Sequence, residues 1–191
     1  KSNKIVHYCS LPTEGNMFIR MQAGALYQKA LNAYAVLNNG TTVFKVKIDA
    51  GKAPEISSRQ ILHPGITNIN CLDATAAGEL WLGCNNGLFK LDYELTKITG
   101  IKNTTGATDI SSLVFEEKGM VWAGSRDIGL FVADTATMQV QKWYRPDVTD
   151  FAGISGNQVL YLYKDPQNIL WVAVWGKGVD YASLAPPVFN H

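Results

Sequence analysis

The chain has 191 residues, 47% of them hydrophobic, and a formal net charge of +1 from 17 Lys and Arg against 16 Asp and Glu. A chain of this length can bury one substantial core or form a piece of a larger ring. The basic residues are scattered and form no stripe, which argues against nucleic acid as a partner. No apolar run approaches the roughly 18 to 20 residues that cross a bilayer, and the first residues lack a signal-peptide core, so export would imply a signal that has been removed.

The first predicted element is a short strand at residues 4–8, which ends before Pro12. We interpret it as the outer strand that closes a preceding structural unit. The equivalent place in later units is taken by residues 60–64, 97–100, 142–146 and 188–191.

The next unit is degenerate. Phe18 and Met21 fit a first strand, and a long turn is predicted over residues 22–31. Tyr34-Ala-Val-Leu then leads into Asn38-Asn39-Gly40, which is typical of a strand followed by a tight turn. Apolar residues between positions 43 and 48 predict the third strand.

Residues 78–92 contain the clearest strand, turn and strand of the chain. Leu80 and Leu82 alternate with Trp81 and Gly83, and Asn85-Asn86-Gly87 supplies a turn that tolerates positive φ. An extended apolar run resumes directly after this turn. The segment therefore predicts a β-hairpin.

The same pattern is repeated twice. The spacing Ile69-x-x-Leu72-x-x-Thr75-x-x-Gly78-x-Leu80-Trp81 recurs without a gap over residues 110–122 and 159–171, so the tryptophans lie 41 and 49 residues apart. A period of this size, made of short strands, is typical of a propeller blade, whereas only residues 21–36 show even a weak helical spacing. We therefore predict that residues 1–191 form a single all-β fragment of a β-propeller. Its four four-stranded blades are expected at about residues 14–64, 65–100, 106–146 and 154–191.

The largest repeated side chains are predicted to be structural. Trp81, Trp122, Trp171 and Tyr34 occupy the same place on the second strand of each blade, where a bulky ring would pack against the next blade. Thr75, Glu116 and Asp165 lie in the first tight turn, where a side-chain oxygen can accept backbone N–H bonds.

The search for reactive groups yields no catalytic residue, metal site or cofactor. The three histidines, His7, His63 and His191, are far apart on outer strands or just after them, which favours neither a metal cluster nor a catalytic triad. No nucleophile elbow, phosphate loop or Cys-x-x-Cys pair occurs. Cys9, Cys71 and Cys84 are interpreted as small apolar residues, and Cys71 and Cys84 are expected to face opposite sides of one hairpin.

The last two blades carry a family resemblance. Trp143-Tyr144-Arg145-Pro146, followed by Ile154-Ser155-Gly156-Asn157-Gln158 and then by Leu170-Trp171 and Trp175-Gly176-x-Gly178, closely resembles the two-component regulator propeller repeat. The resemblance covers residues 60–191 well and 4–59 weakly, and it departs from the family pattern at Tyr34, Cys84, Ser125, Ala173 and Val174. It implies the periplasmic sensor region of a hybrid two-component histidine kinase, with the kinase elsewhere in the full-length protein. It also implies a ring of about seven blades and an oligosaccharide as the usual input.

A ligand is expected on the propeller face formed by the turns between second and third strands and by the beginnings of the first strands. This face should carry an aromatic plane for a sugar and amide, guanidinium, carboxylate and ammonium groups for its hydroxyls. For any one of these residues taken alone, packing within its own turn or between blades is the favoured interpretation. The candidate residues are Trp175, Lys177, Arg126, Asp127, Asn85 and Asn86.

Three functions stay open at this point. The resemblance favours a ligand-sensing propeller that is not itself an enzyme. The first alternative is a protein-interaction or homodimerisation propeller without a small-molecule site, and the second is a propeller lyase or hydrolase. Open blade edges lead us to expect that the isolated chain self-associates, with the remaining blades and signalling domains of a longer protein as its natural partners.

Overall fold

All elements that the structure describes are β-strands. It is a computed structural model, and it describes residues 26–29, 32–38, 42–48, 55–61, 66, 68–75, 79–92, 96–101, 108–116, 119–147 and 153–184. Because every described element is a strand, the all-β prediction is confirmed. Within the same ranges no helix is long and apolar enough to span a membrane.

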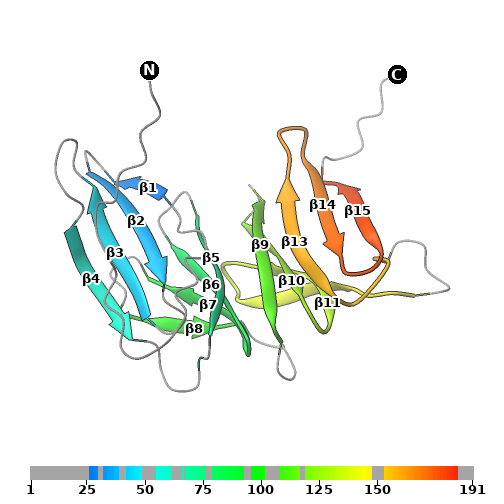
Figure 1. Cartoon of the computed structure of the whole chain (residues 1–191), viewed down its shortest axis with the longest axis horizontal. Coiled ribbons are helices and arrows are strands. Elements are labelled where there is room, and N and C mark those ends of the chain that lie inside the picture. Colours follow the sequence, from blue (N-terminus) through cyan, green and yellow to red (C-terminus); the bar gives the residue numbers. More distant parts are fainter. Residues whose placement is uncertain are drawn as a thin grey trace.

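The strands form four antiparallel sheets, and within each sheet they lie side by side in chain order. Figure 1 shows the sheets following one another from blue through green to red. Blade 1 contains β1 (Leu26–Lys29), β2 (Asn32–Asn38), β3 (Thr42–Ile48) and β4 (Glu55–Ile61). Blade 2 contains β5 (Ile69–Ala74), β6 (Leu80–Cys84), β7 (Gly87–Leu91) and β8 (Ile98–Gly100). Blade 3 contains β9 (Ile110–Glu116), β10 (Met120–Ser125), β11 (Gly129–Asp134) and β12 (Gln139–Tyr144). Blade 4 contains, within the described residues, β13 (Val159–Lys164), β14 (Ile169–Val174) and β15 (Gly178–Ser183).

The first strand of blade 1 lies where the sequence predicts a turn. β1 falls within residues 22–31 and pairs with β2, with Leu26 opposite Ala35 and Lys29 opposite Asn32. The prediction of a continuous turn there is wrong, because main-chain pairing with a neighbouring strand can hold a segment that lacks the apolar spacing of the other first strands. The first strand predicted at Phe18 and Met21 lies outside the described residues.

Two outer strands begin earlier than the sequence predicts, whereas β8 (Ile98–Gly100) lies within the predicted residues 97–100. β4 spans Glu55–Ile61 instead of 60–64, and β12 spans Gln139–Tyr144 instead of 142–146. In blade 3 the reason is visible, because β12 contains only exposed and half-buried residues and therefore has no run of buried residues to mark its ends. The outer strands predicted at residues 4–8 and 188–191 lie outside the described part of the chain, as do His7, His63, His191 and Cys9.

The sheets of blades 2 and 3 each pack their tryptophan-bearing face against the following sheet. Trp81 of blade 2 is buried in a cluster with Ile110 and Phe131 of blade 3. Trp122 of blade 3 is likewise buried against Leu162 and Val172 of blade 4. Trp171 of blade 4 remains 40% exposed. Replacing a buried tryptophan by Ala typically costs about 3 to 5 kcal/mol, so these junctions are a main source of stability. Tyr34 lies in β2, and its side chain is outside the described part.

A glycine two residues after each buried tryptophan sets how closely the blades approach. A Cβ atom added to Gly83 would lie 2.5 Å from Ile110 Cγ2, and one added to Gly124 would lie 2.5 Å from Val159 Cγ1. Ile110 and Val159 begin the first strands of blades 3 and 4. Any larger side chain would therefore push the next first strand outward.

The two described cysteines of blade 2 face opposite sides of their sheet, as predicted. Cys84 packs in the cluster between blades 1 and 2, whereas Cys71 packs against the cluster between blades 2 and 3. Both are free thiols, and burial raises the pKa of each to about 12. Because the thiolate is the reactive form, both groups are poor nucleophiles at neutral pH.

The indole N–H groups of the repeated tryptophans are satisfied in two blades. Trp122 Nε1 donates to Glu116 at 3.2 Å, and Trp171 Nε1 donates to Asp165 at 2.9 Å, each acceptor lying six residues earlier in the chain. The equivalent residue for Trp81 is Thr75, and Trp81 Nε1 is buried without a hydrogen-bond partner. A buried unsatisfied donor costs about 1 to 3 kcal/mol.

We predict that Thr75→Asp raises the free energy of unfolding by about 1 kcal/mol, because a carboxylate there accepts the Trp81 N–H. It also preserves an acceptor for Glu79 N, which now donates to Thr75 Oγ1 at 3.2 Å, as Asp165 accepts from Ile169 N at 2.9 Å. Urea denaturation measures the change. The matched control places Thr75→Asp in a Trp81→Phe background, where no N–H exists. A gain of the same size in both backgrounds would disprove this account.

Three aspartates hold the hairpin turns through hydrogen bonds that favour their charged form. The pKa of Asp165 is lowered chiefly by the N–H of Ile169, that of Asp134 by the N–H of Thr137, and that of Asp92 by the hydroxyl of Thr96. A carboxyl group whose pKa is lower in the folded state stabilises the fold fully above its unfolded pKa. That contribution is lost as the pH falls through the folded value.

We therefore predict that the free energy of unfolding decreases as the pH is lowered below about 5, and that replacing all three aspartates by Asn flattens this dependence. Asn keeps an oxygen acceptor in each turn but does not titrate. Urea denaturation between pH 3 and pH 6 provides the comparison. Equal pH slopes for the parent and the triple variant would contradict the assignment.

Candidate functional site

The six predicted ligand-binding residues lie in the turns between the second and third strands of blades 2, 3 and 4. Each of these turns is tied by a backbone hydrogen bond to the residue immediately before the first strand of its own blade. Asn85 N donates to Asn68 O at 3.2 Å, Arg126 N to Asp109 O at 2.9 Å, and Trp175 N to Gln158 O at 2.9 Å. Three blades thus build one face in the same way, which we call the turn face.

The side chains on the turn face differ in their exposure and in the hydrogen bonds that they make within the protein. Trp175 is 66% exposed, and Lys177 in the same turn is also exposed. Asn85 and Asn86 are half-buried. Asp127 is exposed, but its carboxylate bonds with Ser125 inside its own turn, where Ser125 Oγ also accepts from Asp127 N at 3.2 Å. The turn of blade 4 is therefore the one with the most accessible aromatic surface.

Arg126 belongs to a network that joins blades 2 and 3. Its Nη1 lies 3.1 and 3.2 Å from the two carboxylate oxygens of Asp109. Asn70 of β5 donates to the same carboxylate at 2.5 Å and to Ile110 O at 3.0 Å. The guanidinium is therefore held at the edge of the turn face, with its charge already paired.

Hydrogen bonds between first strands continue from blade 3 to blade 4. Ser111 Oγ donates to Val159 O at 2.6 Å, and Ser112 Oγ accepts from Leu162 N at 3.1 Å. Both serines are buried. Together with the bond from Asn70 to Ile110 O, they hold β5, β9 and β13 next to one another.

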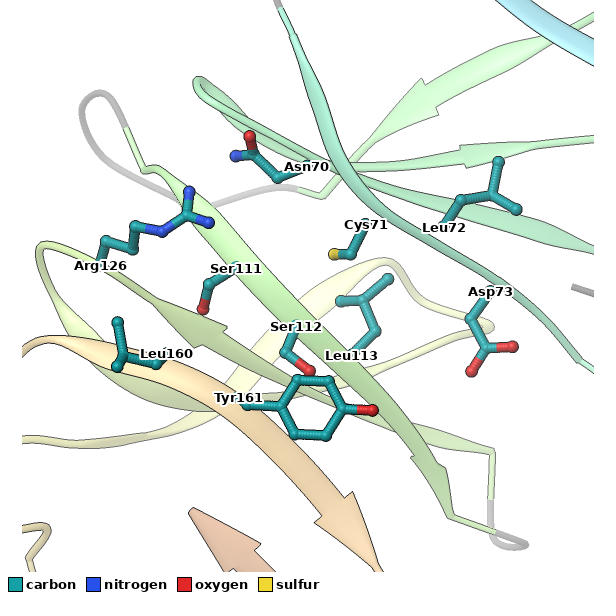
Figure 2. Close-up of a pocket in the computed structure, with 10 residues that line it drawn as sticks. All are labelled: Asn70, Cys71, Leu72, Asp73, Ser111, Ser112, Leu113, Arg126, Leu160 and Tyr161. Atoms are coloured by element: carbon teal, nitrogen blue, oxygen red, sulfur yellow. The ribbon is translucent and has the colours of Figure 1, made fainter. Parts of the chain in front are cut away.

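These three strands enclose a cavity of about 430 Å³, which we call the inner-strand pocket. Figure 2 shows its lining side chains on β5, β9 and β13, with Arg126 at one end. Its volume lies within the range of about 300 to 1,000 Å³ that is usual for small-molecule sites. The pocket is lined by Asn70, Cys71, Leu72, Asp73, Ser111, Ser112, Leu113, Arg126, Leu160 and Tyr161.

Arg126 is the one predicted ligand residue that lines this pocket. Asn85, Asn86, Asp127, Trp175 and Lys177 lie on the turn face and are not among the lining residues.

Sequence reasoning missed Asn70, Asp73 and Tyr161. They lie inside first strands, beside the positions that repeat from blade to blade. The sequence feature that could have identified them is that their polar and aromatic side chains do not repeat from blade to blade.

A second cavity, of about 470 Å³, lies between blades 3 and 4. Its carboxylates already bind protein groups, since Glu116 accepts from Trp122 Nε1 and Asp180 accepts from Ser155 N at 2.7 Å and Ser155 Oγ at 2.9 Å. No group of three or more His, Cys, Asp or Glu in the described residues is arranged to hold a metal ion.

Comparison with protein families identifies one segment of the chain. Residues 153–176 match the model of the two-component regulator propeller family. This match lies inside the stretch whose motifs suggest that family, and it confirms the resemblance. No curated protein matches the chain.

Solved structures show the same fold at low sequence identity. The extracellular domain of the hybrid two-component system BT3049 from B. thetaiotaomicron is 18% identical, with a TM-score of 0.60 over 82% of this chain and 19% of that one. The computationally designed Ika4 protein is 18% identical, with a TM-score of 0.59 over 95% of this chain and 100% of that one. PorZ, a surface component of the type-IX secretion system of Porphyromonas gingivalis, is 15% identical, with a TM-score of 0.53 over 88% of this chain and 22% of that one.

These comparisons place the four sheets in a known architecture. Together with the family match, they confirm the prediction of a β-propeller. The chain spans about a fifth of the BT3049 domain, so it corresponds to a small part of that protein.

Proposed function

We propose that the chain is part of the extracytoplasmic, periplasmic sensor region of a two-component signalling protein, because residues 153–176 match the model of the two-component regulator propeller family. Its ligand on this proposal is an oligosaccharide. The similarity of the fold to the extracellular domain of a hybrid two-component system supports this role. The partners would then be the remaining blades and the signalling domains of the full-length protein, including a histidine kinase. The part described here would detect the ligand and carry out no catalysis.

The observation that carries the proposal is the exposed turn of blade 4. Trp175 offers an indole that is 66% exposed, with the Lys177 ammonium group in the same turn. A sugar ring has an apolar C–H face that can lie on an aromatic plane and hydroxyl groups that need donors and acceptors. The turn face provides both kinds of group without a metal or cofactor.

A thermal-shift experiment with a panel of oligosaccharides tests the proposal. A ligand at about a hundred times its dissociation constant stabilises the folded chain by about 2.7 kcal/mol, which produces a measurable rise in Tm. We predict such a rise for at least one oligosaccharide and its loss in Trp175→Ala. The control is Tyr181→Ala, which removes an equally exposed ring from β15, away from the turn. Stabilisation that is unaffected by Trp175→Ala would remove the turn of blade 4 from the site, and no stabilisation by any sugar would contradict the sensor proposal.

A second candidate function is protein interaction, and one observation specifically favours it. Among the residues of blades 2, 3 and 4 whose burial the structure describes, every large hydrophobic residue that is strongly exposed lies in blade 4 or in its β14–β15 turn. Trp171 of this blade occupies the position at which Trp81 and Trp122 are buried against a following sheet. The blade 4 surface therefore fits a further propeller sheet, supplied by the rest of the ring or by a second copy in a homodimer. The exposed residues are Leu160, Tyr161, Tyr163, Trp171, Trp175, Val179 and Tyr181.

Sedimentation velocity over a range of concentrations distinguishes these two suppliers for the isolated chain. Association that weakens in Tyr181→Ala would show that two copies cover this surface. A monomer at all concentrations would leave the remaining blades as the partner and exclude the homodimer.

A further inference from the structure

The third strand of blade 4 is open on the side that faces blade 3. Ala182 of β15 occupies the same position in the repeat as Ala133 of β11, because each lies opposite the residue that precedes the repeated tryptophan. Ala133 is 0% exposed, whereas Ala182 is exposed. Since the two side chains are identical, the difference lies in what covers them.

In blade 3 the cover is the fourth strand. Val140 of β12 lies opposite Ala133 and packs, together with Trp143, against the cluster between blades 2 and 3. Among the described strands, none pairs with the outer edge of β15. Unpaired backbone N–H and C=O groups along such an edge are a template for a further strand.

The second cavity, of about 470 Å³, lies beside this edge. Ala182, Ser183 and Leu184 line it from blade 4, and Trp122 and Leu130 line it from blade 3. Its two carboxylates already accept hydrogen bonds from protein groups. An apolar side chain can therefore fill the cavity without leaving either carboxylate unpaired.

The chain leaves β15 as it leaves the third strand of blade 3. Leu184 N donates to Asn168 O at 2.8 Å. In blade 3, Thr135 N donates in the same way to Gly119 O at 2.9 Å. In both blades the acceptor lies three residues before the repeated tryptophan. The segment that follows Leu184 therefore starts where the β11–β12 turn starts in blade 3.

That segment also has the length that a fourth strand requires. β12 begins five positions after the last residue of β11, and Val188 lies five positions after the last residue of β15. The turn itself must differ in conformation, because Pro187 stands at the position of Met138, whose φ of 57° proline cannot adopt. The spacing nevertheless allows a hairpin that returns along β15.

We propose that residues 188–191 form the fourth strand of blade 4 along β15, with the Phe189 side chain inserted into the cavity between blades 3 and 4. Phe189 is the largest apolar side chain among residues 185–191. In an extended strand its neighbours Val188 and Asn190 point to the opposite face of the sheet. The inference is independent of the sensor proposal, and it assigns this cavity to the protein's own chain instead of a ligand.

Hydrogen exchange of the backbone amides, followed by NMR at several protein concentrations, tests this inference. We expect protected amides along the outer edge of β15, and exchange that is at least tenfold faster in Phe189→Ala. Val188→Ala is the matched control, because it truncates the adjacent apolar side chain on the opposite face and should change the exchange less than threefold. The amides of β6 and β7 in blade 2 report whether each variant is folded. Should they also lose protection in Phe189→Ala, Phe189→Leu supplies the comparison, since it keeps an apolar side chain and should retain most of the protection.

The other outcomes overturn the inference. Unprotected amides on the outer edge of β15 in the parent chain would show that no strand covers it. Equal acceleration in Phe189→Ala and Val188→Ala would show that Phe189 is not the inserted side chain. Protection that survives Phe189→Ala and is lost on deletion of residues 1–8 would identify the other predicted outer strand as the occupant. Protection that rises with protein concentration would identify a second copy of the chain.

Discussion

The arrangement of this molecule depends on the contact between a glycine in the second strand of one blade and the first strand of the next. Gly83 and Gly124 leave no room for a side chain, so Ile110 and Val159 lie directly against the neighbouring sheet. This close approach buries the tryptophan two residues before each glycine. It also brings the first strands within hydrogen-bonding distance of one another, as the bond from Ser111 to Val159 O shows. The inner-strand pocket is a consequence of that spacing.

A repeated frame of this kind leaves function to the positions that do not repeat. In blades 2 and 3 the frame uses the repeated leucine, tryptophan and glycine positions, and blade 4 keeps the leucine and the tryptophan but has Ala173 in place of the glycine. The positions between them can vary without loss of packing, and they carry Asn70 in β5 and Tyr161 in β13. The same division separates the two tryptophans of blade 4, since Trp171 belongs to the frame and Trp175 to a turn. Side chains at these positions can therefore change without changing the stacking of the blades.

The sequence was sufficient to predict the frame because residues 69–81, 110–122 and 159–171 show the same spacing of apolar residues and tryptophan. Trp81 and Trp122 each have a glycine three residues before and two residues after them in the sequence, and both are buried in the structure. It was not sufficient where only backbone pairing defines an element, as in β1 at Leu26–Lys29, since its sequence lacks the spacing of the other first strands. The inner-strand pocket escaped prediction for a related reason. Its residues come from three first strands and from the β10–β11 turn, which lie far apart in the sequence.

The close approach of successive blades is tested most directly by the effect of Gly124→Ala on the free energy of unfolding. Where a strand has room, replacing Gly by Ala stabilises a protein by about 0.4 to 1 kcal/mol, because the unfolded chain loses conformational freedom. Here the new Cβ would lie 2.5 Å from Val159 Cγ1, and we expect a destabilisation of about 1 to 3 kcal/mol instead. A lower free energy of unfolding in Gly124→Ala would show that blades 3 and 4 are in close contact at this glycine. A more stable Gly124→Ala protein would show that the blades do not meet at this glycine and would contradict the account.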